Sequence, residues 1–131
     1  MKVSVIIPSW NGKELLAVSL RSLAKQTFKD FEVIVVDNGS TDETVSFTKN
    51  QFPKIKVVQL AKNYGFAKAV NEGIKQSRSK YLFLLNNDTR VDRNCLKYLV
   101  EAADKQRGYG MVAAKMLNFN NPRVIDGAGD L

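Results

Sequence analysis

Short apolar runs alternate along the chain with longer segments in which apolar residues return every three or four positions. A run that is apolar throughout is typical of a strand covered on both faces, whereas the longer repeat is typical of a helix with one buried face. The pattern predicts strands at residues 3–7, 31–36, 55–60, 81–85 and 111–117. It predicts helices between them, at residues 12–26, 40–50, 66–77 and 92–105.

Two of the predicted helices are preceded by capping signals. Asn11 comes before the first helix with Glu14 three residues later, and Ser40-Thr41-Asp42-Glu43 has the form of a capping box. We therefore expect Asn11 to cap the first helix and Asp42 to have a structural role at the second. The periodic positions predict buried faces made of Leu15, Leu16, Leu20, Leu23 and Ala24 in the first helix and Phe66, Ala69, Val70 and Ile74 in the third.

The order of these elements predicts an α/β fold. A helix follows each of the first four strands, and right-handed crossovers of this kind form a Rossmann-like, mostly parallel sheet with helices on both faces. Ligands bind such sheets at the carboxyl ends of the strands. The loops expected to carry function are therefore residues 8–12, 37–42, 61–65 and 86–92.

The composition narrows the possible chemistry. The chain has 131 residues, no histidine and one cysteine, and this length suits one domain that buries roughly two-thirds of its unfolded surface. Without histidine there is no imidazole base, no Ser-His or Cys-His nucleophile and no histidine zinc ligand, so catalysis would use carboxylates, amides, hydroxyls, lysines or a metal. A single cysteine excludes an intrachain disulfide, and Cys95 is expected to be a reduced, half-buried thiol.

The charge balance gives little evidence of a polyanionic partner. The net charge is +7, but the basic residues stand singly along the sequence, so we expect no nucleic-acid partner. The apolar run before Pro8 is too short for a signal peptide, and no apolar segment approaches membrane-spanning length. We therefore expect a cytoplasmic protein, either free or held at the cytoplasmic face of the membrane.

The loop after the first strand lacks the known phosphate-binding patterns. Pro8-Ser9-Trp10-Asn11-Gly12 has neither the three glycines of a dinucleotide fold nor the Gly-Lys-Ser/Thr of a phosphate loop. A nicotinamide dehydrogenase and a nucleoside triphosphatase are therefore disfavoured.

Two residues at the first two strand ends have both a structural and a functional interpretation. Trp10 either packs partly into the core or offers a flat surface on which a nucleobase stacks. Asp37 either shapes the turn with Gly39 or accepts hydrogen bonds from a base or a ribose hydroxyl.

The third and fourth strand ends leave the same choice open. Asn63 and Gly65 either form a turn or bring the N-terminus of the next helix, with Asn71 beyond it, to a ligand. Leu84-Leu85-Asn86-Asn87-Asp88 either forms a turn rich in Asn and Asp or places polar groups at the rim of the sheet. Asp88 suits Mg²⁺ or Mn²⁺ held mainly by diphosphate oxygens and water, since Mg²⁺ usually takes only one or two protein carboxylates.

Taken together, four segments resemble the family 2 glycosyltransferases, and most closely the rhamnosyltransferase-like members. The segments are Val5 to Asn11, Val35 to Asp42, Asn63-Tyr64-Gly65-Phe66 and Leu85-Asn86-Asn87-Asp88, and their order and spacing also match. The resemblance implies a GT-A fold and an inverting transfer of a sugar from a UDP-, dTDP- or GDP-linked donor to a saccharide or lipid-linked acceptor. It also implies Mg²⁺ or Mn²⁺ as the cofactor.

The resemblance assigns roles position by position. Pro8 and Trp10 correspond to residues around the base, Asp37 to the acid that contacts the base, Asn87 to a ribose or sugar contact and Asp88 to the metal ligand. The expected nucleotide-sugar-binding residues are Pro8, Ser9, Trp10, Asn11, Asp37, Asn63, Gly65, Asn71, Asn86 and Asn87.

No residue of the chain is expected to act as the catalytic base. In the family this base comes from a later Glu-Asp motif, and we expect neither Asp126 nor Asp130 to replace it. Residues 1–131 are therefore expected to form a single nucleotide-sugar-binding domain, an incomplete catalytic domain truncated at its C-terminal side, which could form a homodimer. The alternative is a non-catalytic nucleotide-sugar-binding module or a subunit completed by another chain.

Overall fold

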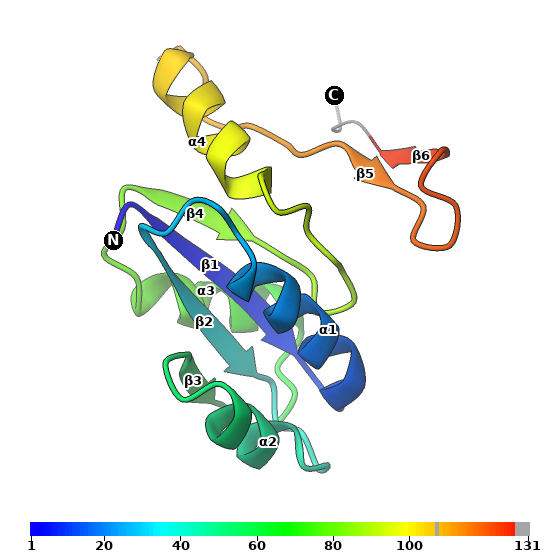
Figure 1. The fold of residues 1–131 in the computed structure, drawn as a ribbon. Coiled ribbons are helices and arrows are strands. Elements are labelled where there is room, and N and C mark those ends of the chain that lie inside the picture. The colour runs from blue at the N-terminus through cyan, green and yellow to red at the C-terminus, as the bar shows by residue number, and fades with distance from the viewer. Residues whose placement is uncertain (107, 128–131) are drawn as a thin grey trace.

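The computed structural model describes residues 1–106 and 108–127 and contains one parallel sheet in the strand order β3-β2-β1-β4 (Figure 1). The strands are β1 (Val3–Ser9), β2 (Phe31–Asp37), β3 (Lys56–Gln59) and β4 (Tyr81–Leu84). The helices are α1 (Lys13–Ala24), α2 (Thr44–Gln51), α3 (Phe66–Lys75) and α4 (Cys95–Lys105). The predicted series of four strands, each followed by a helix, is confirmed.

Strand β1 lies inside the sheet and pairs with a neighbour on each side. It pairs with β2 from Val3↔Phe31 to Ser9↔Asp37, and with β4 from Val3↔Tyr81 to Ile6↔Leu84. All three pairings of the sheet are parallel. The carboxyl ends of the four strands therefore lie along one edge.

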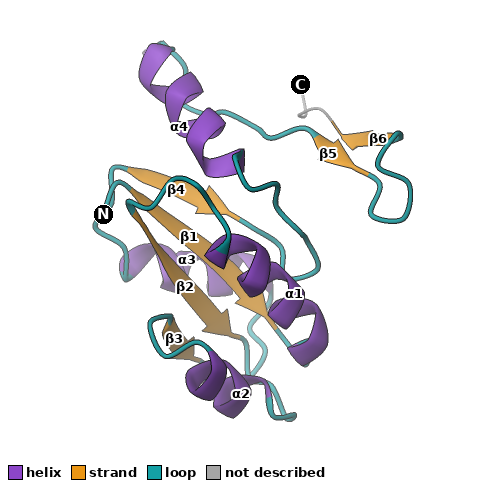
Figure 2. Ribbon diagram, in the orientation of Figure 1, coloured by secondary structure: helices purple, strands orange, loops and turns teal. Residues whose placement is uncertain are grey.

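Helices cover both faces of this sheet, as the sequence predicts. Figure 2 shows α1 and α3 on opposite faces. On one face Val5 and Ile7 pack with Leu20 of α1 and Leu96 of α4, and the other face holds a smaller cluster. The smaller cluster consists of Ile6, Ile34, Val36 and Ala69, the last from α3. Successive β1 side chains point to opposite faces, so both clusters draw on the same strand.

Three predicted core residues are exposed, and one of them is Ala24, the last residue of α1. Phe66 at the start of α3 is 59% exposed and Leu15 of α1 is 53% exposed, although Leu16 and Ala69 are buried. Phe66 and Leu15 lie in the first turns of their helices, on the side of the sheet edge where the loops gather. The helical period identified the buried faces but did not show that their ends extend beyond the sheet.

The prediction of a fifth strand at 111–117 is wrong. Only β5 (Met116–Leu117) forms in this range, and it pairs antiparallel with β6 (Ile125–Gly127) in a separate two-stranded sheet. The local turn explains this pairing, because the side chain of Asn118 accepts hydrogen bonds from the main-chain N–H groups of Asn120 and Asn121. The two short strands lie beyond β4 in Figure 1 and do not extend the main sheet.

The capping predictions also need correction. The residue preceding α1 is Gly12, and Asn11, with φ of 48°, points its side chain to another loop. Helix α2 begins at Thr44, later than predicted, and Asp42 accepts a 2.9 Å hydrogen bond from the Thr44 N–H. Burial disfavours the charged form of Asp42, but the bonds from Thr44 outweigh it and lower the pKa of the carboxyl. The structural role expected for Asp42 is confirmed.

Helix α4 is attached to the domain at both of its ends. At its start, the fully buried Gln26 accepts a bond from the Leu96 N–H at 3.0 Å and donates to the Asp92 carbonyl at 2.6 Å. At its end, Asp104 accepts bonds from Lys2, Lys80 and Tyr81. These bonds hold the pKa of Asp104 well below its usual range. Polar contacts therefore fix α4 against β1 and β4.

Two further predictions concern membrane-spanning segments and the state of Cys95. Within the described residues, no helix has the length and apolar character needed to cross a membrane. Cys95 is half-buried, as predicted, and burial, with the nearby Asp92 charge, raises the pKa of its thiol. A raised pKa disfavours the reactive thiolate at neutral pH.

Replacing Gln26 tests the attachment of α4. We expect Gln26→Ala to lower the free energy of unfolding by about 1 to 3 kcal/mol, because the buried Leu96 N–H loses its partner. Chemical denaturation measures this difference. Gln51→Ala, at an exposed position at the end of α2, is the control and should change stability by less than about 0.5 kcal/mol. Equal stabilities of the two variants would contradict the role given to Gln26.

Candidate functional site

The candidate site lies along the edge formed by the carboxyl ends of the strands. Strand β1 pairs with β2 on one side and with β4 on the other, so the direction of chain winding reverses between β1 and β4. Such a reversal opens a crevice at the strand ends, where open α/β sheets bind ligands. Ser9 is the last residue of β1, Asp37 is the last residue of β2 and Asn87 lies shortly after β4. The three residues thus come from neighbouring strands of the sheet.

Asp37 is the most constrained polar residue of the edge. It is 1% exposed, and its Oδ2 accepts a 3.1 Å hydrogen bond from the Ser40 N–H. Its Oδ1 is buried and has no hydrogen-bond partner among the described residues. A buried carboxylate oxygen without a partner is costly, so a ligand N–H or O–H donated to it would be stabilising. Both sequence interpretations of Asp37 are therefore compatible with the structure, because one oxygen shapes the turn and the other has no hydrogen-bond partner among the described residues.

Asn38 is a residue that the sequence analysis missed. Its side chain is buried and donates to Asn63 Oδ1 and to the Gly65 carbonyl, both at 3.1 Å, and accepts from the Tyr64 N–H at 2.9 Å. The Asn38 N–H donates to the Ser9 carbonyl. The Asn38 side chain thus fixes the loop after β3 beside Asp37. It also gives the side-chain carbonyl oxygen of Asn63 a hydrogen-bond partner. The signal available in the sequence was an Asn directly after the predicted acid.

Gly39 lets the same two loops approach closely. Its φ is 78°, and a Cβ placed there would lie 2.5 Å from Lys62 Cα and 2.8 Å from Asn63 N. Any other residue would meet main-chain atoms and not a movable side chain. Gly39 is therefore required both for the turn and for the spacing of the loops.

Asn11 connects the loop after β1 to the loop after β2. Its Oδ1 accepts from the N–H groups of Thr41 at 2.8 Å and Asp42 at 3.3 Å, and its own N–H donates to Ser40 Oγ at 2.9 Å. The Asn11 side chain, which was predicted to contact a nucleotide, thus holds the loop after β2 in place.

The aromatic residues of the edge are largely exposed. Trp10 is 54% exposed and Tyr64 is 46% exposed, and the Lys62 ammonium lies 5.2 Å from the centre of the Tyr64 ring. Exposure of more than half of Trp10 does not support the core-packing interpretation. A flat apolar surface at the strand ends is suited to base stacking. Pro8, still within β1, is half-buried.

Residues 86–88 lie beside the carboxyl end of β1. Asn87 donates to Ser9 Oγ at 3.1 Å, and the side chain of Asn87 lies against Gly12, where a Cβ would be 2.6 Å from Asn87 Nδ2. Asn87 and Asp88 form a turn, and Thr89 Oγ1 donates to the Asn86 carbonyl at 2.7 Å. The turn interpretation is therefore correct, and the same turn leaves Asn86 and Asp88 exposed at the rim.

Asp88 fits a metal that takes most of its ligands from a substrate. Its carboxylate is exposed, and no ion pair or hydrogen bond to it occurs among the described residues. Within residues 1–106 and 108–127, no three His, Cys, Asp or Glu side chains gather into a metal cluster. A single carboxylate matches the way Mg²⁺ is held by one or two protein carboxylates together with phosphate oxygens and water.

Asn71 lies apart from the other predicted residues, whereas Gly65 belongs to the loop that Asn38 holds. Gly65 precedes α3 with φ of 87°, and the space beside it is open. Asn71 is exposed in the second turn of α3, about 8 Å along the axis from the helix start. The structure therefore brings Ser9, Asn11, Asp37, Asn63 and Asn87 into one bonded set and leaves Asn71 outside it.

Comparison with known proteins supports an assignment to a family. The model of the family "Glycosyl transferase family 2" matches residues 4–126. The poly(ribitol-phosphate) β-N-acetylglucosaminyltransferase TarS of Staphylococcus aureus is 37% identical over 129 residues, covering 95% of this chain and 22% of TarS. The chain thus spans less than a quarter of the length of this relative.

Solved structures share the fold. A crystal structure of residues 1–349 of S. aureus TarS with UDP-GlcNAc has a TM-score of 0.76 and 29% identity, covering 92% of this chain and 42% of that one. A mannosyltransferase of Pyrobaculum calidifontis, solved with GDP-Man and Mn²⁺, has a TM-score of 0.71 and 24% identity, covering 78% of this chain and 32% of that one. The α/β architecture of the chain matches that of these GT-A proteins. From its family-model match over residues 4–126 and from its fold, the chain belongs to the family 2 glycosyltransferases.

Proposed function

We propose that the chain binds a nucleoside diphosphate sugar at the carboxyl edge of the sheet and forms the donor-binding part of an inverting, metal-dependent glycosyltransferase. The observation that carries the proposal is the buried Oδ1 of Asp37, which has no partner among the described residues and lies at the carboxyl end of β2, level with Ser9 of β1. The related TarS structure with UDP-GlcNAc makes a uridine nucleotide the first donor to test.

The base would be bound by Asp37 and the exposed aromatic surface near it. An imide or amino N–H of a base can donate to Asp37 Oδ1, and the base can stack on Trp10. The hydrogen bonds of Asn38 and Asn11 hold the loops that carry these groups before any ligand arrives. Groups held in place beforehand lose little conformational entropy on binding.

The diphosphate and sugar would extend from β1 toward β4. Asn87 stands beside Ser9 and offers an amide to a ribose or sugar hydroxyl, and Asp88 would hold Mg²⁺ or Mn²⁺. The metal, when bound, neutralises charge on the departing diphosphate. Asp88 contributes one carboxylate and leaves the remaining ligand positions to phosphate oxygens and water.

The acceptor hydroxyl needs a base, and the proposal assigns this role to no residue of the chain. Asp126 is exposed on β6, and Asp130 lies outside the described residues. Transfer to an acceptor is therefore proposed only for a protein that supplies a further carboxylate to this site.

Titration calorimetry with UDP tests the donor site. We expect binding that strengthens when Mn²⁺ is present, and a loss of about tenfold in affinity for Asp37→Asn, because a charge-assisted hydrogen bond becomes a neutral one. Asp88→Ala should remove the difference between titrations with and without Mn²⁺. Glu101→Gln removes the same charge at an exposed position on α4 and serves as the control. Absence of UDP binding, or equal affinities in all four proteins, would refute the donor site.

A second prediction concerns the spacing of the loops. Gly39→Ala should cost at least about 1 to 2 kcal/mol of stability through its positive φ, and should weaken UDP binding further by moving residues 61–65 from Asp37. Thermal unfolding and calorimetry on the same samples separate the two effects. Gly110→Ala, where a Cβ meets nothing within 4 Å, is the matched control. Unchanged UDP affinity in Gly39→Ala would show that the loop spacing does not matter for the nucleotide.

A further inference from the structure

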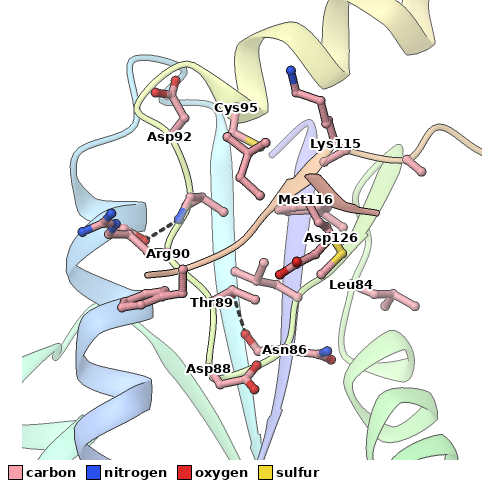
Figure 3. Close-up of a pocket in the computed structure, with 18 of the residues that line it drawn as sticks. Leu84, Asn86, Asp88, Thr89, Arg90, Asp92, Cys95, Lys115, Met116 and Asp126 are labelled. Atoms are coloured by element: carbon pink, nitrogen blue, oxygen red, sulfur yellow. Dashed lines mark hydrogen bonds between the residues drawn. The ribbon is translucent and has the colours of Figure 1, made fainter. Parts of the chain in front are cut away.

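A large cavity lies beyond β4, on the side of Asp88 away from Asp37. Its volume is about 1360 Å³, and it is bounded by the second half of α1, the loop after β4 and the segment from Gly110 to Phe119. Figure 3 shows Asn86 and Asp88 at one end of it and Asp92, Cys95 and Lys115 at the other. The cavity thus begins at the proposed metal ligand and extends away from the nucleotide residues.

The strand order gives this cavity a place in the proposed reaction. Along the edge, Asp37 of β2 comes first, Ser9 of β1 next and Asp88 after β4, with the cavity beyond. If the nucleotide occupies the first two positions and the diphosphate the third, the sugar would lie where the crevice meets the cavity. An attacking hydroxyl can approach the sugar from the cavity side.

Basic side chains from three separate segments line this cavity. We call the cavity the cationic groove, after the five basic residues of its otherwise mainly apolar lining, Arg21, Lys25, Arg90, Arg93 and Lys115. None of the five forms an ion pair in the part of the chain that the structure describes, residues 1–106 and 108–127. The carboxylates of the groove are Asp88, Asp92 and Asp126. Asp88 would be neutralised by its metal, so positive charge dominates the groove when the donor site is loaded.

Four of the five cations are carried by the end of α1 or by a loop that is bonded to it. Arg21 and Lys25 stand one turn apart at the end of α1. The loop that carries Arg90 and Arg93 is bonded to α1, since the Val91 N–H donates to Ser22 Oγ at 3.1 Å and the Thr27 N–H donates to the Arg93 carbonyl at 2.8 Å.

The opposite wall contributes a further contact. The Arg90 guanidinium lies 5.1 Å from the centre of the Phe119 ring. This cation–π contact joins the loop after β4 to the segment before β6. An arginine stacked in this way keeps its donors free for an anion. The groove therefore holds one of its cations, Arg90, against its opposite wall, and its five basic side chains form no ion pair among the described residues.

From this geometry we infer that the cationic groove receives the acceptor and that the acceptor carries phosphate groups. The inference rests on the proposed function, because it takes the sugar donor to lie at Asp88. A neutral saccharide would make no ionic contact with the five cations, whereas phosphates along a polymer would pair with them as the chain passes through. The relative TarS is named as acting on poly(ribitol-phosphate), a polymer of this chemistry.

Binding of defined oligomers tests the inference. The protein is titrated with a ribitol phosphate oligomer, with an uncharged N-acetylglucosamine oligomer of equal length and with phosphatidylglycerol vesicles, each in the presence of UDP and Mn²⁺ at several salt concentrations. We expect binding only to the phosphate oligomer, weakening as salt rises.

A double variant and its matched control locate the binding. Arg21→Gln with Arg93→Gln, both exposed side chains, should weaken binding of the phosphate oligomer by about tenfold and reduce its salt dependence. Lys49→Gln with Lys54→Gln removes the same charge from exposed positions outside the groove and should change the affinity by less than about twofold. Affinity for UDP should be the same in both double variants.

Several outcomes overturn the inference. They are equal losses in the two double variants, equal binding of the uncharged oligomer, binding of the vesicles alone, and no binding of the phosphate oligomer by a protein that binds UDP. Failure of the proposed function appears separately in the same samples, as an absence of UDP binding.

Discussion

The pairing of β1 on both of its sides is the constraint on which the rest of the structure depends. A strand that is hydrogen-bonded to two parallel neighbours fixes their registers at once, and here Ser9 is level with Asp37 and Ile6 with Leu84. Because parallel strands need long connections, each crossover passes over a face of the sheet and returns to the same starting edge. The polar residues that follow the four strands are therefore brought to one edge, although they are far apart in sequence.

Asparagine side chains then set the positions of the loops at that edge. Asn11 connects the loops after β1 and β2, Asn38 connects the loops after β2 and β3, and Asn87 connects the turn after β4 to β1. An amide side chain has both a donor and an acceptor, so it can bond to two main-chain groups of a neighbouring loop. These contacts leave Oδ1 of Asp37 without a partner, which gives the edge one buried acceptor held in place.

Helix α1 connects the two halves of the proposed site. The loop that leads into it contains Trp10 and Asn11, which lie at the nucleotide end. Toward and just beyond the other end of the helix, Ser22 and Gln26 bond to the loop after β4 and to the start of α4. The position of Asp88 therefore depends on the packing of α1 as well as on β4. The bond from Val91 to Ser22 also holds the loop that carries Arg90 and Arg93 of the cationic groove, so the proposed donor and acceptor sides share one support.

The sequence by itself determined the order of the elements, the parallel α/β class and the residues at each strand end. These properties follow from local periodicity and from topology, and the segments around Pro8, Asp37, Asn63 and Asp88 could be identified because parallel strands place their carboxyl ends together. Local capping signals predicted less well, because Asn11 forms bonds to a loop that is 30 residues away in sequence.

Only the tertiary structure decided three matters, and two of them depend on contacts between distant segments. It showed that residues 111–117 leave the sheet, because a local turn at Asn118 pairs β5 with β6. It showed that Asp37 is buried with one free oxygen, since burial depends on what the loops after β1 and β3 cover. It also gathered basic residues that stand singly in the sequence around one cavity, because charge clustering is a property of distance in space and not of distance along the chain.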